Sequence, residues 1–257
     1  MGSGLWRQGQ PADRVAGGQA RVVLVRHLAA VTVLLPLLAL TLCYALSLYM
    51  HFDLANRTHC LVFNFFPSIS SAAGKFSPQK FIWRALLALH LAPRVLLGYL
   101  THAHLARVLR QSPRCRRLTA TCLLLYALEQ AGLSGVSFVG SLEHYTLHKV
   151  SFIVFVAASE AYMVLVTALL SRCRAAPPPP HEQTSLRWKQ RLLTLNVFSL
   201  VVAMYLFVRH NTYCEPGVYS LFAIFETCMV LSNMAFHFTS YWDFHDLQLC
   251  IARVAQD

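Results

Sequence analysis

Charged side chains are scarce in this sequence. They make up 13% of its 257 residues, about half the share that a soluble globular domain carries. Acidic residues are the scarcest, with 11 Asp and Glu against 22 Lys and Arg, whereas 56% of the residues are hydrophobic. So few charges argue against a soluble domain of this length. The composition instead predicts an all-α protein that crosses a membrane several times.

Six apolar runs are long enough to cross a hydrocarbon core about 30 Å thick, which needs roughly 20 helical residues. They lie at about 27–50, 81–105, 118–140, 149–171, 190–210 and 218–241. No soluble domain is left over, and the first run is too long for the apolar core of a cleavable signal peptide. The sequence therefore predicts a bundle of six transmembrane helices over residues 27–241.

Basic residues are unevenly distributed among the connections, and cytosolic connections carry the excess. Four Arg precede the first run, five lie between the second and third, and five Lys or Arg lie around the fourth-to-fifth connection. Both termini are therefore predicted to be cytosolic, as a basic tail over 1–26 and a second tail over 242–257. The linker over 172–189, which contains consecutive prolines, is predicted to be cytosolic, and the loop over 51–80 luminal.

The formal net charge of +11 has the same origin, because most basic residues lie in connections where they set topology. No nucleic-acid partner is therefore predicted. Membrane lipid is a predicted partner, since basic loops can contact anionic headgroups.

Two cysteines, Cys60 and Cys214, lie in connections predicted to be luminal. In an oxidising lumen they are the well-placed pair for a disulfide, which would join the first luminal loop to the turn between the fifth and sixth helices. The alternative is two free thiols in buried turns.

Ionisable residues recur inside the apolar runs, where they are costly and usually face the bundle interior. At about 100° per residue, His90 and Arg94 share one face of the second predicted helix, and Glu226, Asn233 and His237 nearly share one face of the sixth. On the predicted topology, the luminal half of the bundle gathers Arg84, His90, Arg94, His148, Arg209, His210 and Glu226, with Glu129 near the midplane.

Two interpretations of these residues stay open. An excess of Arg and His around a luminal recess suits a ligand with phosphate or carboxylate groups, and a His beside a carboxylate can act as a general base. The alternative is structural, with Arg94 paired with Glu129, Arg209 paired with Glu226, and the histidines bonded to backbone groups. The excess of cations favours a ligand site, and no metal site is predicted.

Four ordered motifs resemble one known family: "THCLVFNFFPSISSAAG", "WRALLALHLAPR", "RHNTYCEPGVYS" and "NMAFHFTSYWDF". Together with the six-helix layout they resemble the post-GPI-attachment-to-proteins factor two branch of the superfamily that includes the damage-regulated autophagy modulators. The resemblance implies a multi-pass Golgi protein, with the endoplasmic reticulum as the other location. It also implies fatty-acid remodelling of glycosylphosphatidylinositol (GPI) anchors, in which a lyso-anchor regains a saturated chain at the sn-2 position.

Under this resemblance the protein is expected to be a lipid O-acyltransferase whose partner is a GPI lipid or a GPI-anchored protein. The candidate catalytic residues are His90, His148, His210, Glu129 and Glu226, and the candidate substrate-binding residues are Arg84, Arg94, Arg209 and Asn211. No cofactor is expected, and the acyl donor is not identified. The alternative is a non-enzymatic lipid-binding or adaptor protein that supports a separate acyltransferase.

One acid departs from the family pattern. Glu160 lies in the middle of the fourth predicted helix. Pairing with a nearby His or Arg is the simple expectation for an acid at that depth.

Overall fold

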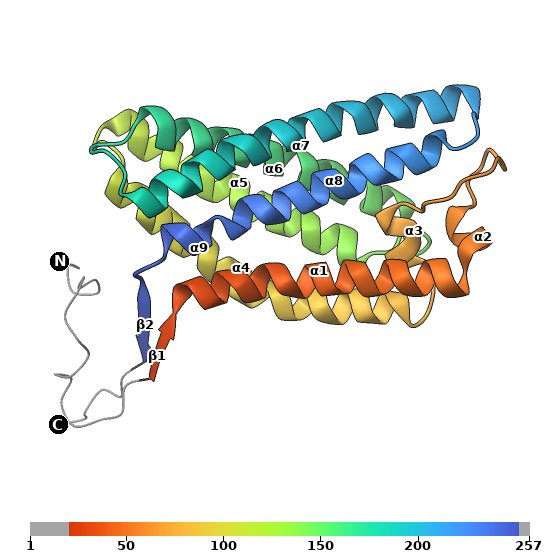
Figure 1. Cartoon of the computed structure of the whole chain (residues 1–257), viewed down its shortest axis with the longest axis horizontal. Helices are drawn as coiled ribbons and strands as arrows, with labels where there is room; N and C mark the ends of the chain where they lie inside the picture. Colours follow the sequence, from red (N-terminus) through yellow and green to blue (C-terminus); the bar gives the residue numbers. More distant parts are fainter. Residues whose placement is uncertain (1–20, 252–257) are drawn as a thin grey trace.

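The computed structural model describes residues 21–251, and within them it is almost entirely helical (Figure 1). The long helices are α1 (Val25–Met50), α4 (Gln79–Val108), α5 (Pro113–Phe138), α6 (Tyr145–Arg172), α7 (Pro180–Tyr213) and α8 (Val218–Phe238). The short helices are α2 (Phe52–Asn56), α3 (Ile69–Gly74) and α9 (Ser240–Asp243). Strands β1 (Arg21–Leu24) and β2 (Gln248–Ile251) form a small antiparallel ribbon. The all-α prediction is confirmed, while the ribbon, α2 and α3 were not foreseen.

Five described helices are long and apolar enough to cross a membrane: α1, α4, α6, α7, and α8 together with α9. The chain is therefore an all-α membrane protein with several spans. Helix α5 has 26 residues, as many as α1, but Glu129, Gln130 and the arginines of its first turn lower its hydropathy. Its place as a sixth span stays a prediction.

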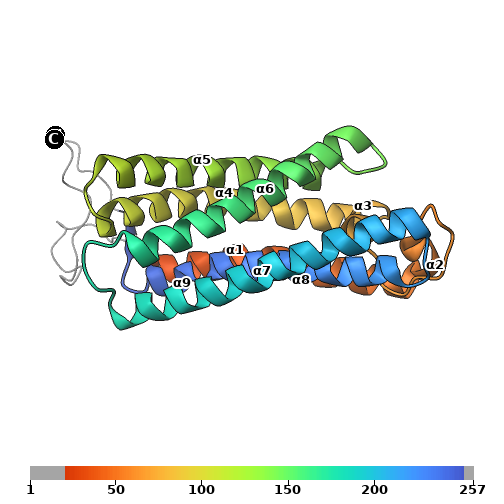
Figure 2. The ribbon, with the colours of Figure 1, turned by 90° about the horizontal axis from the view of Figure 1, so that it is seen from above.

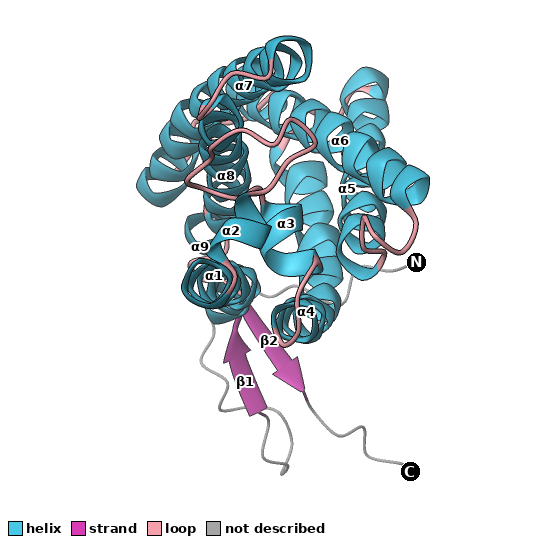
Figure 3. Ribbon diagram, turned by 90° about the vertical axis from the view of Figure 1, so that its right-hand side faces the viewer, coloured by secondary structure: helices cyan, strands magenta, loops and turns pink. Residues whose placement is uncertain are grey.

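The long helices run side by side along the bundle (Figure 2). They pack most extensively in three pairs, α1 with α4, α5 with α6, and α7 with α8. Seen end on, α2 and α3 lie across one end of the bundle (Figure 3). We call this the loop end. The end that carries β1 and β2 is called the strand end. The strand end also holds the α4–α5 and α6–α7 connections (Figure 1), where Leu109 and Arg174 form a backbone bridge.

Small residues let α5 and α6 approach closely. A Cβ added to Gly132 would lie 2.5 Å from the backbone nitrogen of Phe155 on α6, and one added to Gly135 would collide with Ser151. Close backbone approach at Gly and Ser is how membrane helices gain packing energy where lipid offers no hydrophobic driving force. This close approach packs α5 against α6, although α5 is the one long helix among the described residues without a stretch apolar enough to qualify as a span.

The turn between α7 and α8 depends on two residues with positive φ. Cys214 ends α7 at φ 50°, and Gly217 precedes α8 at φ 77°. Between them, Pro216 cannot donate the backbone hydrogen bond that would continue a helix. The Gly217 N–H instead donates to the Phe63 carbonyl at 2.8 Å, which ties the turn to the loop that follows α2.

The connection between α6 and α7 is shorter than the predicted linker over 172–189. Helix α6 ends at Arg172, and α7 begins at Pro180. Proline is favoured at the first position of a helix, because its missing N–H would have no partner there and its fixed φ suits the helix. Helix α7 therefore extends well beyond the apolar run predicted at 190–210.

Candidate functional site

A buried cluster of polar side chains surrounds Glu129 in the middle of the bundle. The Glu129 side chain is fully buried, and its Oε1 accepts hydrogen bonds from Arg94 Nη2 at 3.3 Å, Asn233 Nδ2 at 3.2 Å and His237 Nε2 at 2.8 Å. Arg94 comes from α4, Glu129 from α5, and Asn233 and His237 from α8. A carboxylate at this depth is costly unless donors surround it, and here three donors converge on one oxygen. We call these four residues the Glu129 cluster.

Aromatic and hydroxyl side chains fix the cluster in place. The Tyr126 hydroxyl donates to the Arg94 carbonyl at 2.7 Å, and the Tyr162 ring stacks on the His237 ring with centroids 5.4 Å apart. Asn233 Nδ2 also donates to Ser159 Oγ at 2.6 Å, so α6 joins the network. Rigid neighbours of this kind hold charged groups in one geometry.

The Arg94 guanidinium has a buried N–H donor without a partner in the described part of the chain. Its Nη2 binds Glu129, whereas its Nε is buried and has no hydrogen-bond partner among the described residues. His90 lies one helical turn earlier on α4, so both side chains lie on the same face. His90 is 3% exposed and lines a small pocket between α4 and α5, together with Ser134 and Ser137. The His90 imidazole and the Arg94 guanidinium thus lie one turn apart on one face of α4, at the edge of the cluster.

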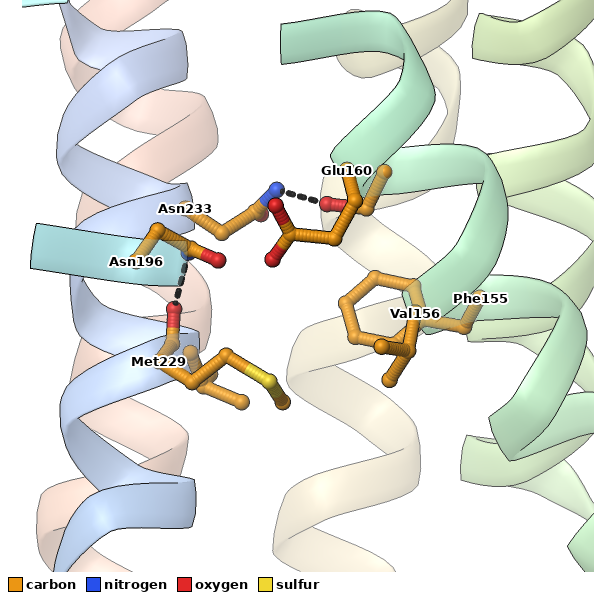
Figure 4. Close-up of a pocket in the computed structure, with 8 residues that line it drawn as sticks. Phe155, Val156, Glu160, Asn196, Met229 and Asn233 are labelled. Atoms are coloured by element: carbon orange, nitrogen blue, oxygen red, sulfur yellow. Dashed lines mark hydrogen bonds between the residues drawn. The ribbon is translucent and has the colours of Figure 1, made fainter. Parts of the chain in front are cut away.

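A second small pocket lies on another side of the cluster, among α6, α7 and α8 (Figure 4). Asn233 is one of its lining residues and also a donor to Glu129. Its other walls are Phe155, Val156, Ser159, Glu160, Asn196, Met229 and Val230. The Glu129 cluster therefore lies between two pockets.

The three arginines predicted to bind substrate each have a carboxylate partner. Arg94 pairs with Glu129, and Arg84 Nη2 lies 2.6 Å from Glu143 Oε2. The Gly140 N–H and the Arg84 guanidinium lower the pKa of the exposed Glu143 carboxyl. These pairs balance part of the cationic excess on which the sequence argument depended.

Arg209 does not pair with Glu226, so that pairing of the structural alternative is wrong, whereas its pairing of Arg94 with Glu129 is confirmed. Arg209 Nε and Nη2 bind the two oxygens of Glu215 at 2.6 and 3.0 Å, and the pair lowers the pKa of Glu215. Glu226 Oε2 instead accepts from the Ile69 N–H at 3.1 Å. Glu226 therefore holds the start of α3 against α8. Asn211 donates to the Phe207 carbonyl within its own helix.

The disulfide between Cys60 and Cys214 is present, which confirms that prediction. Beside it lies His210, 1% exposed, with no hydrogen-bond partner for either ring nitrogen among the described residues. The rings of His59 and Tyr219 lie 5.6 and 5.0 Å from it. His59, Cys60 and Cys214 have the proximity of metal ligands, but sulfurs joined in a disulfide are not thiolate ligands.

His148 joins three elements at the loop end. Its Nδ1 donates to the Val139 carbonyl at 2.7 Å, and its Nε2 lies 3.2 Å from Ser70 Oγ. A carbonyl only accepts, so Nδ1 carries the proton in this bond. His148 thereby fastens the start of α6 to the end of α5 and to α3.

The predicted site residues do not lie together around one pocket. His90, Arg94 and Glu129 lie together in the interior, whereas Arg209, His210 and Asn211 lie near the disulfide. Arg84, His148 and Glu226 form separate ties between elements. Of these nine residues, only His90 lines either of the two described pockets.

Sequence reasoning assigned no site role to His237, Asn233 or Ser159. The shared face of Asn233 and His237 on α8 was visible from their spacing. Their contact with Glu129 was not, because the tilt and depth of one helix against another depend on packing across the whole bundle. Ser159 gave no signal, since a serine in an apolar helix is ordinary.

Comparison with known proteins gives a consistent result. The family model described as the Frag1/DRAM/Sfk1/Cwh43P N-terminal domain matches residues 25–247. No solved structure matches the chain. "Post-GPI attachment to proteins factor 2" of Drosophila melanogaster is 43% identical over 87% of each chain.

Two further relatives support the same assignment. "Acyltransferase PGAP2" of Xenopus tropicalis is 38% identical over 86% of this chain and 87% of its own. "Post-GPI attachment to proteins factor 2" of Caenorhabditis elegans is 40% identical over 82% of each chain. With the family model matching most of its length and such relatives covering nearly all of it, the chain belongs to the Frag1/DRAM/Sfk1 family, in its post-GPI attachment to proteins factor 2 branch.

Proposed function

We propose that the protein is a Golgi membrane acyltransferase that returns a saturated fatty acid to the sn-2 hydroxyl of a lyso-GPI anchor. Relatives named for post-GPI attachment, some of them also named acyltransferase, support this substrate and reaction class. The observation that carries the proposal is His90 at a pocket next to an Arg94 whose Nε donor is unused. Acyl transfer to a hydroxyl needs a base and an oxyanion donor.

The proposed layout has six transmembrane helices, the five named above and α5, with both termini in the cytosol. The strand end then faces the cytosol, and the loop end with its disulfide faces the lumen. A disulfide persists in an oxidising compartment, which supports this orientation. The close packing of α5 against α6 supports its inclusion among the spans.

In the proposed reaction, the lyso-lipid hydroxyl approaches His90 from the pocket between α4 and α5. Its oxygen attacks the acyl carbonyl carbon of the donor as its proton passes to the imidazole. Negative charge then develops on the carbonyl oxygen, and the positive charge of Arg94, one turn along the same face of α4, stabilises it. The imidazolium returns the proton to the leaving group as the donor's acyl bond breaks.

Glu129 and His237 act as positioning residues in this scheme. Glu129 fixes the Arg94 guanidinium and balances its charge, while Asn233 and His237 fix the carboxylate. Because a preorganised donor costs no reorganisation when charge develops, this support contributes to transition-state stabilisation. Neither residue needs to touch the substrate.

Replacing His90 tests the proposal in cells. In cells lacking the endogenous activity, His90→Ala should reduce saturated sn-2 chains on GPI-anchored proteins by about 100-fold or more, the usual cost of losing an acid–base group. The readout is mass spectrometry of the released anchor lipid. His102→Ala is the matched control, because His102 is on the same helix but bonds only to the Thr119 carbonyl, away from both pockets. A normal lipid profile in His90→Ala would remove His90 from the mechanism.

A second candidate function is a non-enzymatic lipid-binding or adaptor role. Two observations favour it. The three arginines expected to hold a headgroup are already paired with carboxylates. Each of the two described pockets also has room for only about one water molecule, far less than a typical small-molecule site offers. Purified protein that binds lyso-lipid but forms no product would favour this role.

A further inference from the structure

Glu160 is the acid that neither the family pattern nor the proposed reaction explains. It lies near the middle of α6, 15 residues after Tyr145 and 12 before Arg172. No described Lys, Arg or His lies within salt-bridge distance of it, and its Oε2 is buried without a hydrogen-bond partner among residues 24–249. The expected pairing with a His or Arg is therefore wrong. A carboxylate at this depth needs a donor from elsewhere.

Asn196 supplies a second unused acceptor in the same pocket (Figure 4). Its side chain is 1% exposed, and its Nδ2 donates to the Met229 carbonyl at 2.8 Å and to Ser232 Oγ at 2.9 Å. Since a carbonyl only accepts, the amide cannot be flipped without losing the bond to Met229. The carboxamide oxygen must then point away from α8, and it has no partner among the described residues.

Asn233 is oriented by the same reasoning. Both hydrogens of its Nδ2 are used, by Glu129 Oε1 and by Ser159 Oγ. Its carboxamide oxygen is therefore available as an acceptor in the pocket that Asn233 lines. The polar lining thus offers acceptor oxygens from Glu160, Asn196 and Asn233, and the amide donors are already committed.

The position of the pocket limits what can supply the missing donor. It lies halfway along α6 and α7, at about 20 Å from either end of α6 at 1.5 Å per residue. Residues on the outer faces of these helices, such as Val164 and Val197, are 49% and 40% exposed and would contact lipid. The rest of the lining includes Phe155, Val156 and Val230.

These features favour an uncharged donor carried by a lipid. A phosphate-bearing headgroup is excluded by the cost of placing its charge at mid-membrane depth. A hydrated metal ion needs six or more oxygen ligands, and an apolar wall cannot replace them. A hydroxyl brings a donor hydrogen and little desolvation cost, and its lipid can enter sideways from the bilayer.

We propose that the pocket among α6, α7 and α8 binds the free hydroxyl of a neutral lipid, with Glu160 and Asn196 as its acceptors. A sterol, a diacylglycerol and a ceramide share this chemistry. The site is distinct from the His90 pocket, which lies between α4 and α5. It does not depend on the proposed acyl transfer.

Photo-crosslinking tests this site in the full-length protein in phosphatidylcholine nanodiscs. The probes are a sterol, a diacylglycerol and a ceramide, each with a photoactivatable group, and each is compared with its O-methyl ether. At least one hydroxyl probe should label peptides from residues 153–164 or 226–234, and its ether should label about tenfold less, because the ether leaves a buried acceptor without its hydrogen bond. The probe that labels identifies the lipid.

Variants separate specific binding from general lipid contact. Glu160→Leu and Asn196→Leu should each reduce labelling at least about fivefold, whereas Glu160→Gln, which keeps an acceptor oxygen, should reduce it less. Ser199→Ala is the matched control, since Ser199 is a buried polar residue on α7 that does not line the pocket. Retention of the Cys60–Cys214 disulfide on a non-reducing gel shows that each variant is folded.

Equal labelling by hydroxyl probes and ethers would overturn the proposal, and so would unchanged labelling in both Leu variants. These results do not test acyl transfer, because lipid binding is measured without an acyl donor. Conversely, a protein without acyltransferase activity that still discriminates hydroxyl from ether keeps the lipid site.

Discussion

At the scale of single residues, the interior of this protein depends on one carboxylate. Glu129 accepts three hydrogen bonds at a position where nothing else described could balance Arg94. The sequence pointed to the pairing of Arg94 with Glu129 as one alternative. It could not show that Arg209 pairs with Glu215. That pair forms because the turn after Tyr213 brings Glu215 back against the end of α7, where Arg209 lies.

Removing the charge of Glu129 should destabilise the bundle strongly. Glu129→Gln leaves Arg94 buried without its counter-ion, and breaking a buried pair costs about 3–5 kcal/mol. The expected result is a clear fall in the melting temperature of the purified protein in detergent. Glu143→Gln is the control, because the Arg84–Glu143 pair is solvent-exposed and should matter little. Equal melting temperatures for the two variants would show that the buried Arg94–Glu129 pair contributes no more to stability than the exposed pair does.

At the scale of helices and turns, apolar runs predicted the core of each long helix better than its ends. Helix α7 was predicted over 190–210 but extends over Pro180–Tyr213. An apolar run reports the length immersed in hydrocarbon, whereas a helix continues as long as its backbone bonds and caps allow. The two short helices α2 and α3 were missed because a loop rich in aromatics and prolines has no helical periodicity.

The disulfide is the element-scale feature with the largest expected effect. It closes a loop across 154 residues of separation and fastens the α7–α8 turn to the first loop. Cys60→Ser or Cys214→Ser should lower the free energy of unfolding by about 2–5 kcal/mol, because the unfolded chain regains the freedom that the bond removes. Melting temperature in detergent is the measurement.

The free cysteine Cys228, half-buried on α8, provides the control. Cys228→Ser should leave the melting temperature nearly unchanged, and reductant should shift the wild type toward the Cys60→Ser value. A wild type that is insensitive to reductant and to both substitutions would mean that the turn is held by its other contacts, such as the Gly217–Phe63 bond.

At the scale of the whole molecule, the orientation in the membrane and the role of α5 are linked. If α5 spans the membrane, the α4–α5 and α5–α6 connections lie on opposite sides. Composition made six spans the natural prediction, yet the polar residues that join α5 to the Glu129 cluster also weaken its hydropathy. A helix that buries its polar side chains against neighbours needs less apolar surface than sequence counting assumes.

Cysteine labelling tests this layout. In a background with Cys115 and Cys173 changed to Ser, a membrane-impermeant thiol reagent should modify Gln111→Cys only from the cytosol. It should modify Glu143→Cys only from the lumen. Both positions are exposed, so access does not limit the reaction. Modification of both from one side would show that α5 does not cross.

The central claim is that this bundle itself catalyses acyl transfer. The most direct measurement is product formation by the purified protein in liposomes that contain lyso-phosphatidylinositol and a saturated acyl donor, with a diacyl phospholipid and an acyl thioester tried in turn. We expect the wild type and His102→Ala to form sn-2 acylated product. His90→Ala should form it at a rate at least about 100-fold lower. Absence of product with every donor, from wild-type protein that retains its disulfide and binds the lyso-lipid, would contradict it and leave a lipid-binding role.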